Sequence, residues 1–498
     1  MLYLSKSKYC SLWQCPKLLW LNKFKPEEKT EDPALQARFD EGNVVGDLAM
    51  GLFGDFIEVT AFKEDGKLDL DEMMRLTKQY IDEGAPNICE ASFSYNGLYC
   101  AVDILRKYGD GYAIYEVKSS TEEKYIYGVD IAYQKYVLEH CGVNVTGTYL
   151  VCIDSSYIRG DELEIDKLFK IIDMSDTVDI EIQNVPSLLR RAEEVMALKD
   201  DPDIDIGLQC EDPYHCAFWE YCTKYIDSPS VFNLYRLPFK KKIDYYNQGL
   251  ISYNDLLFSG KISNEKQIRQ MMFAVTEQKP HIDKDNIRDF LQSLSYPLYF
   301  LDFETMQQVI PQYKGTRPYE QIPFQYSLHY IEHEGGELKH KEFLAESGVD
   351  PRRALAEQLC EDIPMDVCVT AYNKAFECTR LKELADAYPD LARHLLNIES
   401  NIVDLLVPFQ SGYYYNKAMG GSFSIKSVLP ALFPNDPALD YHNLEGVHNG
   451  GDAMNLFPRI KDLPPEEQQI ARHNLLKYCE LDTYAMVKLW EELERAAK

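Results

Sequence analysis

Four charged residues in the stretch 90–118 could do chemistry together: Glu90, Asp103, Glu116 and Lys118. Carboxylates bind Mg²⁺ or Mn²⁺, and a lysine beside them can orient or activate an attacking water molecule. Lys118 shares a face with Glu116, because side chains alternate along a strand. Metal-assisted hydrolysis of a phosphodiester needs this combination. The alternative is a solvated strand face with alternating charges, since a single Asp…Glu-x-Lys match is common by chance.

Three strands joined by two tight turns must position these residues. Asn-Gly at 96–97 is a strong hairpin signal, and Gly-Asp at 109–110 is a second turn candidate. With two-residue turns at both places, Asp103 lies opposite Glu90 on one side and opposite Glu116 on the other. Directly opposed side chains are about 4.5–5.5 Å apart, so the three carboxylates would repel one another without a cation among them.

A second group of acidic residues follows the apolar run at 299–301, which predicts a central buried strand. Asp302 and Glu304 end this strand on one face. Unpaired buried carboxylates are costly, so a strand that ends in two of them indicates a functional reason. Near the C-terminus, a predicted helix places Tyr478 and Asp482 four residues apart on one surface.

Four cysteines have the pattern of a metal or cluster site. Cys210, Cys216 and Cys222 recur at six-residue intervals beside aromatic residues, and Cys15 precedes a proline near the N-terminus. Four thiolates complete a zinc or [4Fe–4S] site. The alternative is that buried free cysteines pack as small hydrophobic side chains. We interpret the other cysteines of the N-terminal half in that way: Cys10, Cys89, Cys100, Cys141 and Cys152.

The residues of the first group resemble the PD-(D/E)XK nuclease superfamily in its RecB-like branch. The resemblance implies Asp103 and Glu116 as metal ligands and Lys118 as the catalytic lysine. It also implies Glu90 as a further member of the site.

Two flanking helices test this resemblance. The segment DIAYQKYVLEHCG is similar to the glutamine-tyrosine motif of the same branch, which implies Gln134 and Tyr136 as DNA-backbone or active-site contacts. The first helix of these enzymes often carries a histidine after a glycine, and FDEGNVVGDLAMGLF has none. Either Glu41 or Asp47 takes its place, or that ligand is absent.

One cysteine before the nuclease motifs and three after them resembles the iron–sulfur RecB-like nucleases, namely the AddB-type helicase-nucleases and the CRISPR-associated adaptation nucleases. The resemblance implies a structural [4Fe–4S] cluster on Cys15, Cys210, Cys216 and Cys222 that clasps the two ends of the domain. Zinc is the alternative metal.

The second group resembles the DEDD 3′–5′ exonucleases of the ribonuclease H-like fold, in their tyrosine variant. The resemblance implies that two divalent cations are held by four acids and that Tyr478 positions the water. The four acids are Asp302, Glu304, Glu377 and Asp482. Glu377 departs from the aspartate usual in the family. Lys477 stands where the histidine variant has its histidine, which excludes that variant.

Three further residues are weaker candidates for contacts with nucleic acid. Asn373 precedes the predicted helix of Glu377, and Ser424 and Lys426 lie in a loop-helix segment similar to one in these exonucleases. Lys426 could equally be a solvated surface residue. Asp404, at the end of another predicted strand, could simply cap a helix.

The overall charge limits where nucleic acid can bind. With 81 acidic and 52 basic residues, the net charge is −29. We therefore expect DNA or RNA to bind only in local basic grooves, with strong salt dependence, and the acidic surface to offer room for a protein partner. No apolar run is long enough for a bilayer and no signal-peptide region is evident, so we expect a cytoplasmic protein without membrane contact. No phosphate-binding loop of an ATP-driven motor is present.

The combined pattern predicts an α/β protein with two mixed-sheet nuclease domains. We expect a RecB-like domain at 1–227, a helical connecting module at 228–294 and a ribonuclease H-like exonuclease domain at 295–498. The expected activity is metal-dependent hydrolysis of DNA ends or single strands at two separate sites. RNA is the alternative substrate. A nucleic-acid-binding or complex-assembly protein with one or both sites decayed is the alternative function.

Overall fold

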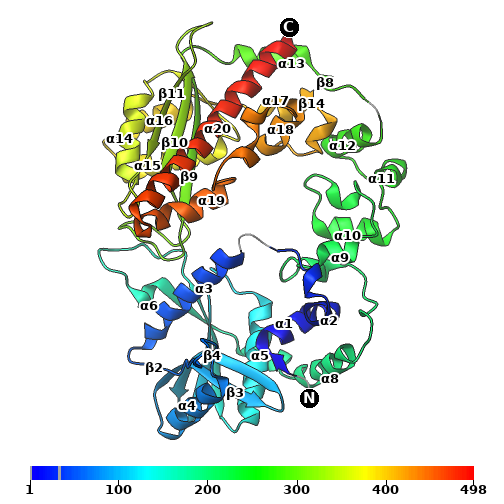
Figure 1. Cartoon of the computed structure of the whole chain (residues 1–498), viewed down its shortest axis with the longest axis vertical. Helices are drawn as coiled ribbons and strands as arrows, with labels where there is room; N and C mark the ends of the chain where they lie inside the picture. The colour runs from blue at the N-terminus through cyan, green and yellow to red at the C-terminus, as the bar shows by residue number, and fades with distance from the viewer. Residues whose placement is uncertain (1–2, 32–34, 277) are drawn as a thin grey trace. The chain divides into compact units, whose positions relative to one another are not determined.

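The computed structural model describes residues 3–31, 35–276 and 278–498. The chain forms two compact units. The first unit runs to Ile226 and includes Val309–Tyr319, and the second comprises Asp227–Gln308 and Glu320–Lys498. The protein is α/β, with a seven-stranded mixed sheet, a five-stranded mixed sheet and a small two-stranded sheet (Figure 1). None of the described helices is long and apolar enough to cross a membrane.

The seven-stranded sheet is the centre of the first unit, with the order β2-β3-β4-β5-β6-β7 and with β1 paired to β4. β3, β4 and β5 form the predicted meander with two-residue turns, because Tyr95 pairs with Leu98 and Tyr108 pairs with Gly111. The strands are β1 (Leu4–Ser5), β2 (Ile57–Glu58), β3 (Asn87–Tyr95), β4 (Leu98–Tyr108), β5 (Gly111–Lys118), β6 (Val145–Ile153) and β7 (Phe169–Asp173).

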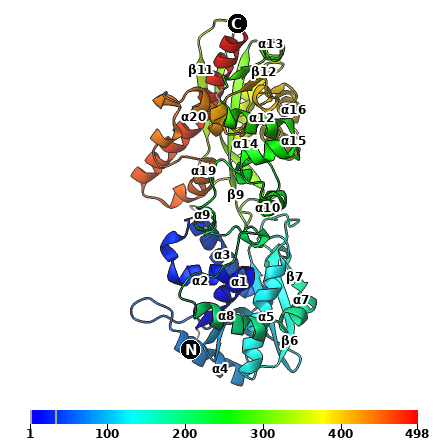
Figure 2. The same ribbon diagram turned by 90° about the vertical axis from the view of Figure 1, so that its right-hand side faces the viewer.

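Helices cover both faces of this sheet, so β5 is buried along almost its whole length. Ile114 of β5 belongs to the same hydrophobic core as α5, and Tyr115 belongs to the core that includes residues of α3. The alternation directs Glu116 towards α5. Figure 2 shows α1, α5 and α8 close together, and they pack against one another. The helices are α1 (Lys6–Gln14), α2 (Pro16–Phe24), α3 (Leu35–Met50), α4 (Leu70–Asp82), α5 (Tyr125–His140), α6 (Ile165–Leu168), α7 (Ser175–Glu181), α8 (Val185–Met196) and α9 (Trp219–Thr223).

The five-stranded sheet of the second unit has the order β11-β10-β9-β12-β13, with β9 at its centre. β9 is antiparallel to β10 and parallel to β12. Leu301 packs against α14, α15 and α16, whereas the ring of Phe300 lies 5.9 Å from that of Trp490 on α20. Asp302 and Glu304 therefore face α20, which runs along the sheet in Figure 1. The strands are β9 (Leu298–Gln307), β10 (Gln321–Ile331), β11 (Lys339–Leu344), β12 (Cys368–Ala371) and β13 (Ile402–Asp404).

Residues 228–294, predicted as a connecting module, fold as part of the second unit. Gln270 Nε2 donates to the carbonyl of Gly420 at 2.7 Å, and Arg288 Nε donates to the carbonyl of Ala497 at 3.0 Å. The strand β8 (His281–Ile282) pairs with β14 (Tyr414–Tyr415). The helices of the second unit are α10 (Phe239–Asn247), α11 (Tyr253–Ser259), α12 (Glu265–Val275), α13 (Lys284–Gln292), α14 (Arg352–Asp362), α15 (Ala375–Ala387), α16 (Ala392–Ser400), α17 (Val407–Gln410), α18 (Ile425–Leu432), α19 (Gly450–Leu456) and α20 (Pro465–Ala497).

Candidate active sites

The meander places Glu90 and Asp103 at the same irregular point of two neighbouring strands. Cys89 pairs with Ile104 and Ala91 pairs with Val102, so Glu90 and Asp103 lie between these two pairs. Glu90 has a φ of +58°, in the left-handed region that non-glycine residues rarely adopt. The flanking pairs have the predicted register, and the pairing of β4 with β5 ends at Ile104 and Tyr115, one residue short of Asp103 and Glu116. The backbone of Glu90 leaves the regular strand conformation at this point.

Glu116 is the centre of the first group, because it is fully buried and accepts hydrogen bonds from three other side chains. Lys118 Nζ donates to Oε1 at 2.5 Å, and Gln134 Nε2 donates to Oε2 at 2.7 Å. Lys6 Nζ donates to Oε1 at 3.0 Å and to Oε2 at 3.2 Å. Asp103 is close to the same ammonium group, with 3.5 Å between its Oδ1 and Lys6 Nζ. The structure brings together Glu116, Lys118 and Gln134, which the sequence predicted, and adds Lys6, which it did not predict.

Asp130 is a second residue that sequence reasoning missed. It lies one helical turn before Gln134 on α5, and its Oδ1 accepts from Gln134 Nε2 at 3.0 Å. Its Oδ2 lies 3.3 Å from Lys118 Nζ. The spacing of four residues on one helix was the available signal. We refer to Glu90, Asp103, Glu116 and Asp130 as the first carboxylate group.

In the first carboxylate group, the pKa values of Asp103 and Glu90 are raised and that of Glu116 is lowered. Burial raises the pKa of Asp103 to about 6, and repulsion from Glu116 acts in the same direction. Burial raises the pKa of Glu90 to about 7, with Asp103 adding to the effect. Burial alone would also raise the pKa of Glu116, but the ammonium groups of Lys118 and Lys6 hold that pKa well below its ordinary value. Glu116 therefore stays ionised over the widest pH range, whereas Asp103 and Glu90 take up protons more readily than an exposed carboxylate does.

The other residues predicted for the first site, Tyr136, Asp47 and Glu41, make no direct contact with Glu116 among the hydrogen bonds of the described residues. The ring of Tyr136 packs at a tilt against that of His140, with 4.1 Å between the ring centroids, on a different face of α5 from Gln134. Of the two candidates for the missing histidine, Asp47 is exposed. Glu41 accepts a hydrogen bond from the hydroxyl of Tyr319, which also donates to the carbonyl of Ser119. Glu41 is thus linked to the residue that follows Lys118.

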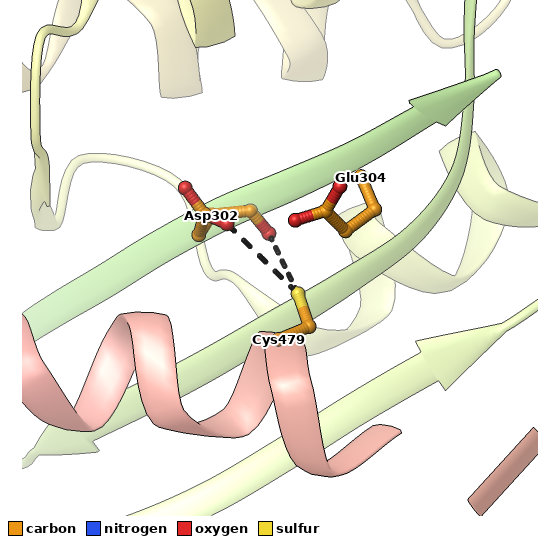
Figure 3. Close-up of side chains that lie close together, drawn as sticks. All are labelled: Asp302, Glu304 and Cys479. Atoms are coloured by element: carbon orange, nitrogen blue, oxygen red, sulfur yellow. Dashed lines mark hydrogen bonds between the residues drawn. The ribbon is translucent and has the colours of Figure 1, made fainter. Parts of the chain in front are cut away.

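The second site forms where β9 meets α20 (Figure 3). Asp302 and Glu304 point from β9 towards Cys479, whose thiol lies 3.8 Å from the carbonyl oxygen of Asp302 and 4.0 Å from its Oδ2. These three residues offer ligand atoms that all lie within 4.8 Å of one another. Cys479 is one helical turn before Asp482, so the helical period was the signal that could have identified it.

Four carboxylates gather here, and we refer to Asp302, Glu304, Glu377 and Asp482 as the second carboxylate group. Asp302 is partly exposed, and the other three are buried. Burial raises the pKa of Asp302 well above its ordinary value, and the charges of Asp482, Glu304 and Glu377 add to the increase. Burial likewise raises the pKa of Asp482 to about 6 and that of Glu377 to about 8. One carboxylate oxygen of Glu377 is buried without a hydrogen-bond partner among the described residues. Such a group requires protons or cations to compensate its charge.

A tyrosine that sequence reasoning missed holds Asp482 in place. Tyr441 Oη donates to Asp482 Oδ1 at 2.6 Å. Lys426 Nζ donates to Tyr478 Oη at 3.3 Å and lies 5.3 Å from the ring centroids of both Tyr441 and Tyr478. Lys426 therefore brings a positive charge to the second carboxylate group. A cavity of about 750 Å³ adjoins Lys426 and Tyr441.

The weaker candidates lie around this site in structural roles. Asn373 has a φ of +67°, and its backbone N–H donates to Asp404 Oδ1 at 2.9 Å. Ser424 is the N-cap residue of α18, and its hydroxyl lies 3.0 Å from that of Ser427. Asp404 thus shapes the turn before α15, the helix that carries Glu377.

The four predicted cluster cysteines lie close to one another at the far end of α1. Cys15 joins α1 to α2, Cys222 is on α9, and the backbone N–H of Cys216 donates to the carbonyl of Cys210 at 2.8 Å. Burial raises the pKa of Cys210 to about 11, and the neighbouring thiols of Cys216, Cys15 and Cys222 contribute to the increase. Among the described residues, however, these thiols do not form a group whose sulfur atoms all lie within 4.8 Å of one another, so the metal or cluster site remains a prediction from the sequence.

Comparisons with known proteins give a family match for part of the second unit. A family described as a domain of unknown function (DUF2779) matches residues 299–424, which include Asp302, Glu304 and Glu377. An uncharacterised protein, UU173 of Ureaplasma parvum serovar 3, is 26% identical over 224 residues. That match covers 40% of this chain and 31% of the relative, so less than a third of the relative's length is represented.

Proposed function

We propose that this protein is a divalent-metal-dependent nuclease with two separate active sites, which hydrolyses phosphodiester bonds at DNA ends or in single strands. The observation that supports this most strongly is the second carboxylate group, in which four acids from β9, α15 and α20, three of them buried, raise the pKa values of Asp302 and Glu304. Such an arrangement is costly in a folded protein unless it has a use. Carboxylate oxygens are the ligands that Mg²⁺ and Mn²⁺ prefer.

At the second site, Asp302, Glu304, Glu377 and Asp482 would hold Mg²⁺ or Mn²⁺. Bound cations supply charge stabilisation for both the attacking and the leaving oxygen of the displacement. Tyr478 orients the water molecule whose oxygen bonds to phosphorus, Tyr441 fixes Asp482, and Lys426 neutralises a phosphate oxygen. The cavity beside Lys426 offers space for the nucleotide being removed. This arrangement is the one expected of a ribonuclease H-like DEDD exonuclease.

At the first site, Asp103 and Glu116 would hold the cation, and Gln134 fixes the orientation of Glu116 through its 2.7 Å hydrogen bond. Lys118 holds the attacking water by its ammonium group and compensates the negative charge that develops on the phosphate. Glu90, with a pKa raised to about 7, accepts or releases a proton near neutral pH. These roles match a PD-(D/E)XK nuclease of the RecB-like branch.

The cysteines would hold a structural [4Fe–4S] cluster, with zinc as the alternative. Thiolate ligands favour iron–sulfur clusters and zinc over hard cations. Protein purified without oxygen should be brown and contain iron and sulfide. Colourless protein with stoichiometric zinc would replace the cluster by a zinc site.

The test is a nuclease assay on end-labelled DNA and RNA with Mg²⁺ or Mn²⁺. Wild type is compared with Asp302→Asn, Lys118→Met and the double variant. Loss of a metal carboxylate or of the catalytic lysine should each remove one activity, and the double variant should be inactive. Asp289→Asn and Lys199→Met are matched controls, because both residues are exposed and distant in sequence from the sites.

The substrate that wild type degrades decides between DNA and RNA. Wild type that cleaves neither nucleic acid under these conditions would refute the proposal. Activity that persists in the double variant would refute the assignment of both sites.

A further inference from the structure

Lys6 is a second lysine in the first carboxylate group. Its ammonium group contacts both carboxylate oxygens of Glu116, at 3.0 and 3.2 Å, and lies 3.5 Å from Asp103 Oδ1. Asp103 and Glu116 are the two residues that would hold the cation. The ammonium group of Lys6 thus contacts both carboxylates that a cation would share.

The backbone that carries Lys6 is fixed by several contacts. β1 pairs with the start of β4, at the point where β5 no longer pairs with β4. Tyr133 Oη donates to the carbonyl of Leu4 at 2.5 Å, and the side chain of Ser5 caps α1. Lys6 is the first residue of α1, so these contacts set its position relative to Glu116. The fold therefore holds Lys6 at this site, and Lys6 is not a mobile surface side chain.

The two lysines of this site differ in what they contact. Lys118 keeps Asp130 as a partner at 3.3 Å in addition to Glu116. Lys6 has only expected cation ligands, Asp103 and Glu116, as its ion-pair partners among the described residues. An ammonium group and a divalent cation repel each other at contact distance in a partly buried site. A bound cation would therefore displace Lys6 from the oxygens of Glu116.

We propose that Lys6 binds the scissile phosphate at the first site and occupies the carboxylates when cation and substrate are absent. When both arrive, its hydrogen bonds pass from Glu116 to a phosphate oxygen. The inference rests on the proposed function of the first site. It has a thermodynamic consequence: Lys6 opposes the cation until an anionic substrate accepts its hydrogen bonds, so Mn²⁺ and single-stranded DNA bind cooperatively, and each increases the affinity of the other by the same factor.

The test measures Mn²⁺ affinity by electron paramagnetic resonance titration in full-length protein carrying Asp302→Asn and Asp482→Asn, which silences the second site. Titrations are made with and without a phosphorothioate-protected single-stranded oligonucleotide. In this background, Lys6→Met should bind Mn²⁺ about tenfold more tightly without DNA, because a competing charge is removed. It should also lose most of the gain that DNA produces and cleave unprotected DNA with a raised KM.

Matched variants separate this role from a structural one. Lys6→Arg should retain the cooperativity. Lys6→Gln, whose uncharged side chain is as long as that of methionine but keeps a polar end, should behave as Lys6→Met. Lys8→Met makes the same charge change on an exposed position of α1 and should leave both affinities unchanged.

Unchanged or weaker Mn²⁺ binding by the folded Lys6→Met and Lys6→Gln variants would overturn the role of Lys6. The nuclease proposal would still stand in that case, provided that Glu116→Gln abolishes Mn²⁺ binding. If no Mn²⁺ binding depends on Glu116, both proposals are refuted.

Discussion

Replacing Asp482 by asparagine should stabilise the metal-free protein while it destroys the second site. Burial raises the pKa of Asp482 from 3.8 to about 6. A folded-state pKa above the unfolded value means that stability is lost as the pH rises through this interval, because the unfolded chain ionises first. At about 1.4 kcal/mol for each tenfold change in the ionisation constant, the loss at neutral pH is about 3 kcal/mol. Asparagine cannot ionise, so the variant does not lose this stability as the pH rises.

The assay is differential scanning calorimetry of the full chain in EDTA at pH 4, 7 and 8. Asp482→Asn should raise the Tm of the second unit by about 5–10 °C at pH 7 and 8 and by little at pH 4. Mn²⁺ should raise the Tm of wild type and have little effect on the variant, since ligand binding stabilises only a protein that retains the site. Asp289→Asn, an exposed carboxylate on α13, is the control.

A difference in stability between variant and wild type that does not depend on pH would refute this reasoning. At low pH Asp482 is protonated in both the folded and the unfolded state, so its ionisation can no longer reduce the stability of wild type. A variant that is less stable than wild type at every pH would show that the Tyr441 hydrogen bond to Asp482, and not charge repulsion, dominates the energetics of this position.

Three further changes test individual contacts. Tyr441→Phe removes a donor that lowers the pKa of Asp482, so the acidic limb of the second-site activity should move up by about one pH unit in a pH–rate profile. Cys15→Ala should loosen α1 and reduce only the first-site activity, measured on DNA in the Asp302→Asn background for the first site and in the Lys118→Met background for the second. Glu377→Asp should keep or increase the second-site activity, measured with Lys118→Met present, since aspartate is the usual residue of the resembled family.

For each of these three predictions, one result would contradict it. A Tyr441→Phe profile that superimposes on wild type would mean that Asp482 does not titrate with activity. Equal losses at both sites in Cys15→Ala would indicate general destabilisation. An inactive but folded Glu377→Asp would show that the longer side chain is required to reach the cation.

The parts of the sites that sequence predicted are those set by local periodicity. Two-residue turns fix the pairing of Tyr95 with Leu98, and this pairing places Asp103 between its acidic neighbours. Alternation along β9 places Asp302 and Glu304 on one face, where they lie within 4.8 Å of Cys479. These relations depend on residues that are near in the chain, so a period of two or of 3.6 residues is sufficient to derive them.

The parts that sequence did not predict depend on contacts between distant segments. Lys6 reaches Glu116 only because β1 pairs with the half of β4 that β5 leaves open, and no local pattern specifies that pairing. Tyr441 lies in a segment of short turns without periodicity. The left-handed backbone of Glu90 arises from the irregular point in the sheet, and glutamate has no intrinsic preference for it.

The first unit also has a consequence for how the chain is made. Val309 belongs to the hydrophobic core formed by Val45 and Ala49 of α3, and Ile310 and Tyr319 pack against that core. This core is therefore incomplete when Ile226 leaves the ribosome, and it remains so until translation has passed Tyr319. Domains normally fold in the order of synthesis. Here the N-terminal unit gains its last core residues from a segment encoded after β9, so the first central strand of the second unit is synthesised before the first unit can complete its core.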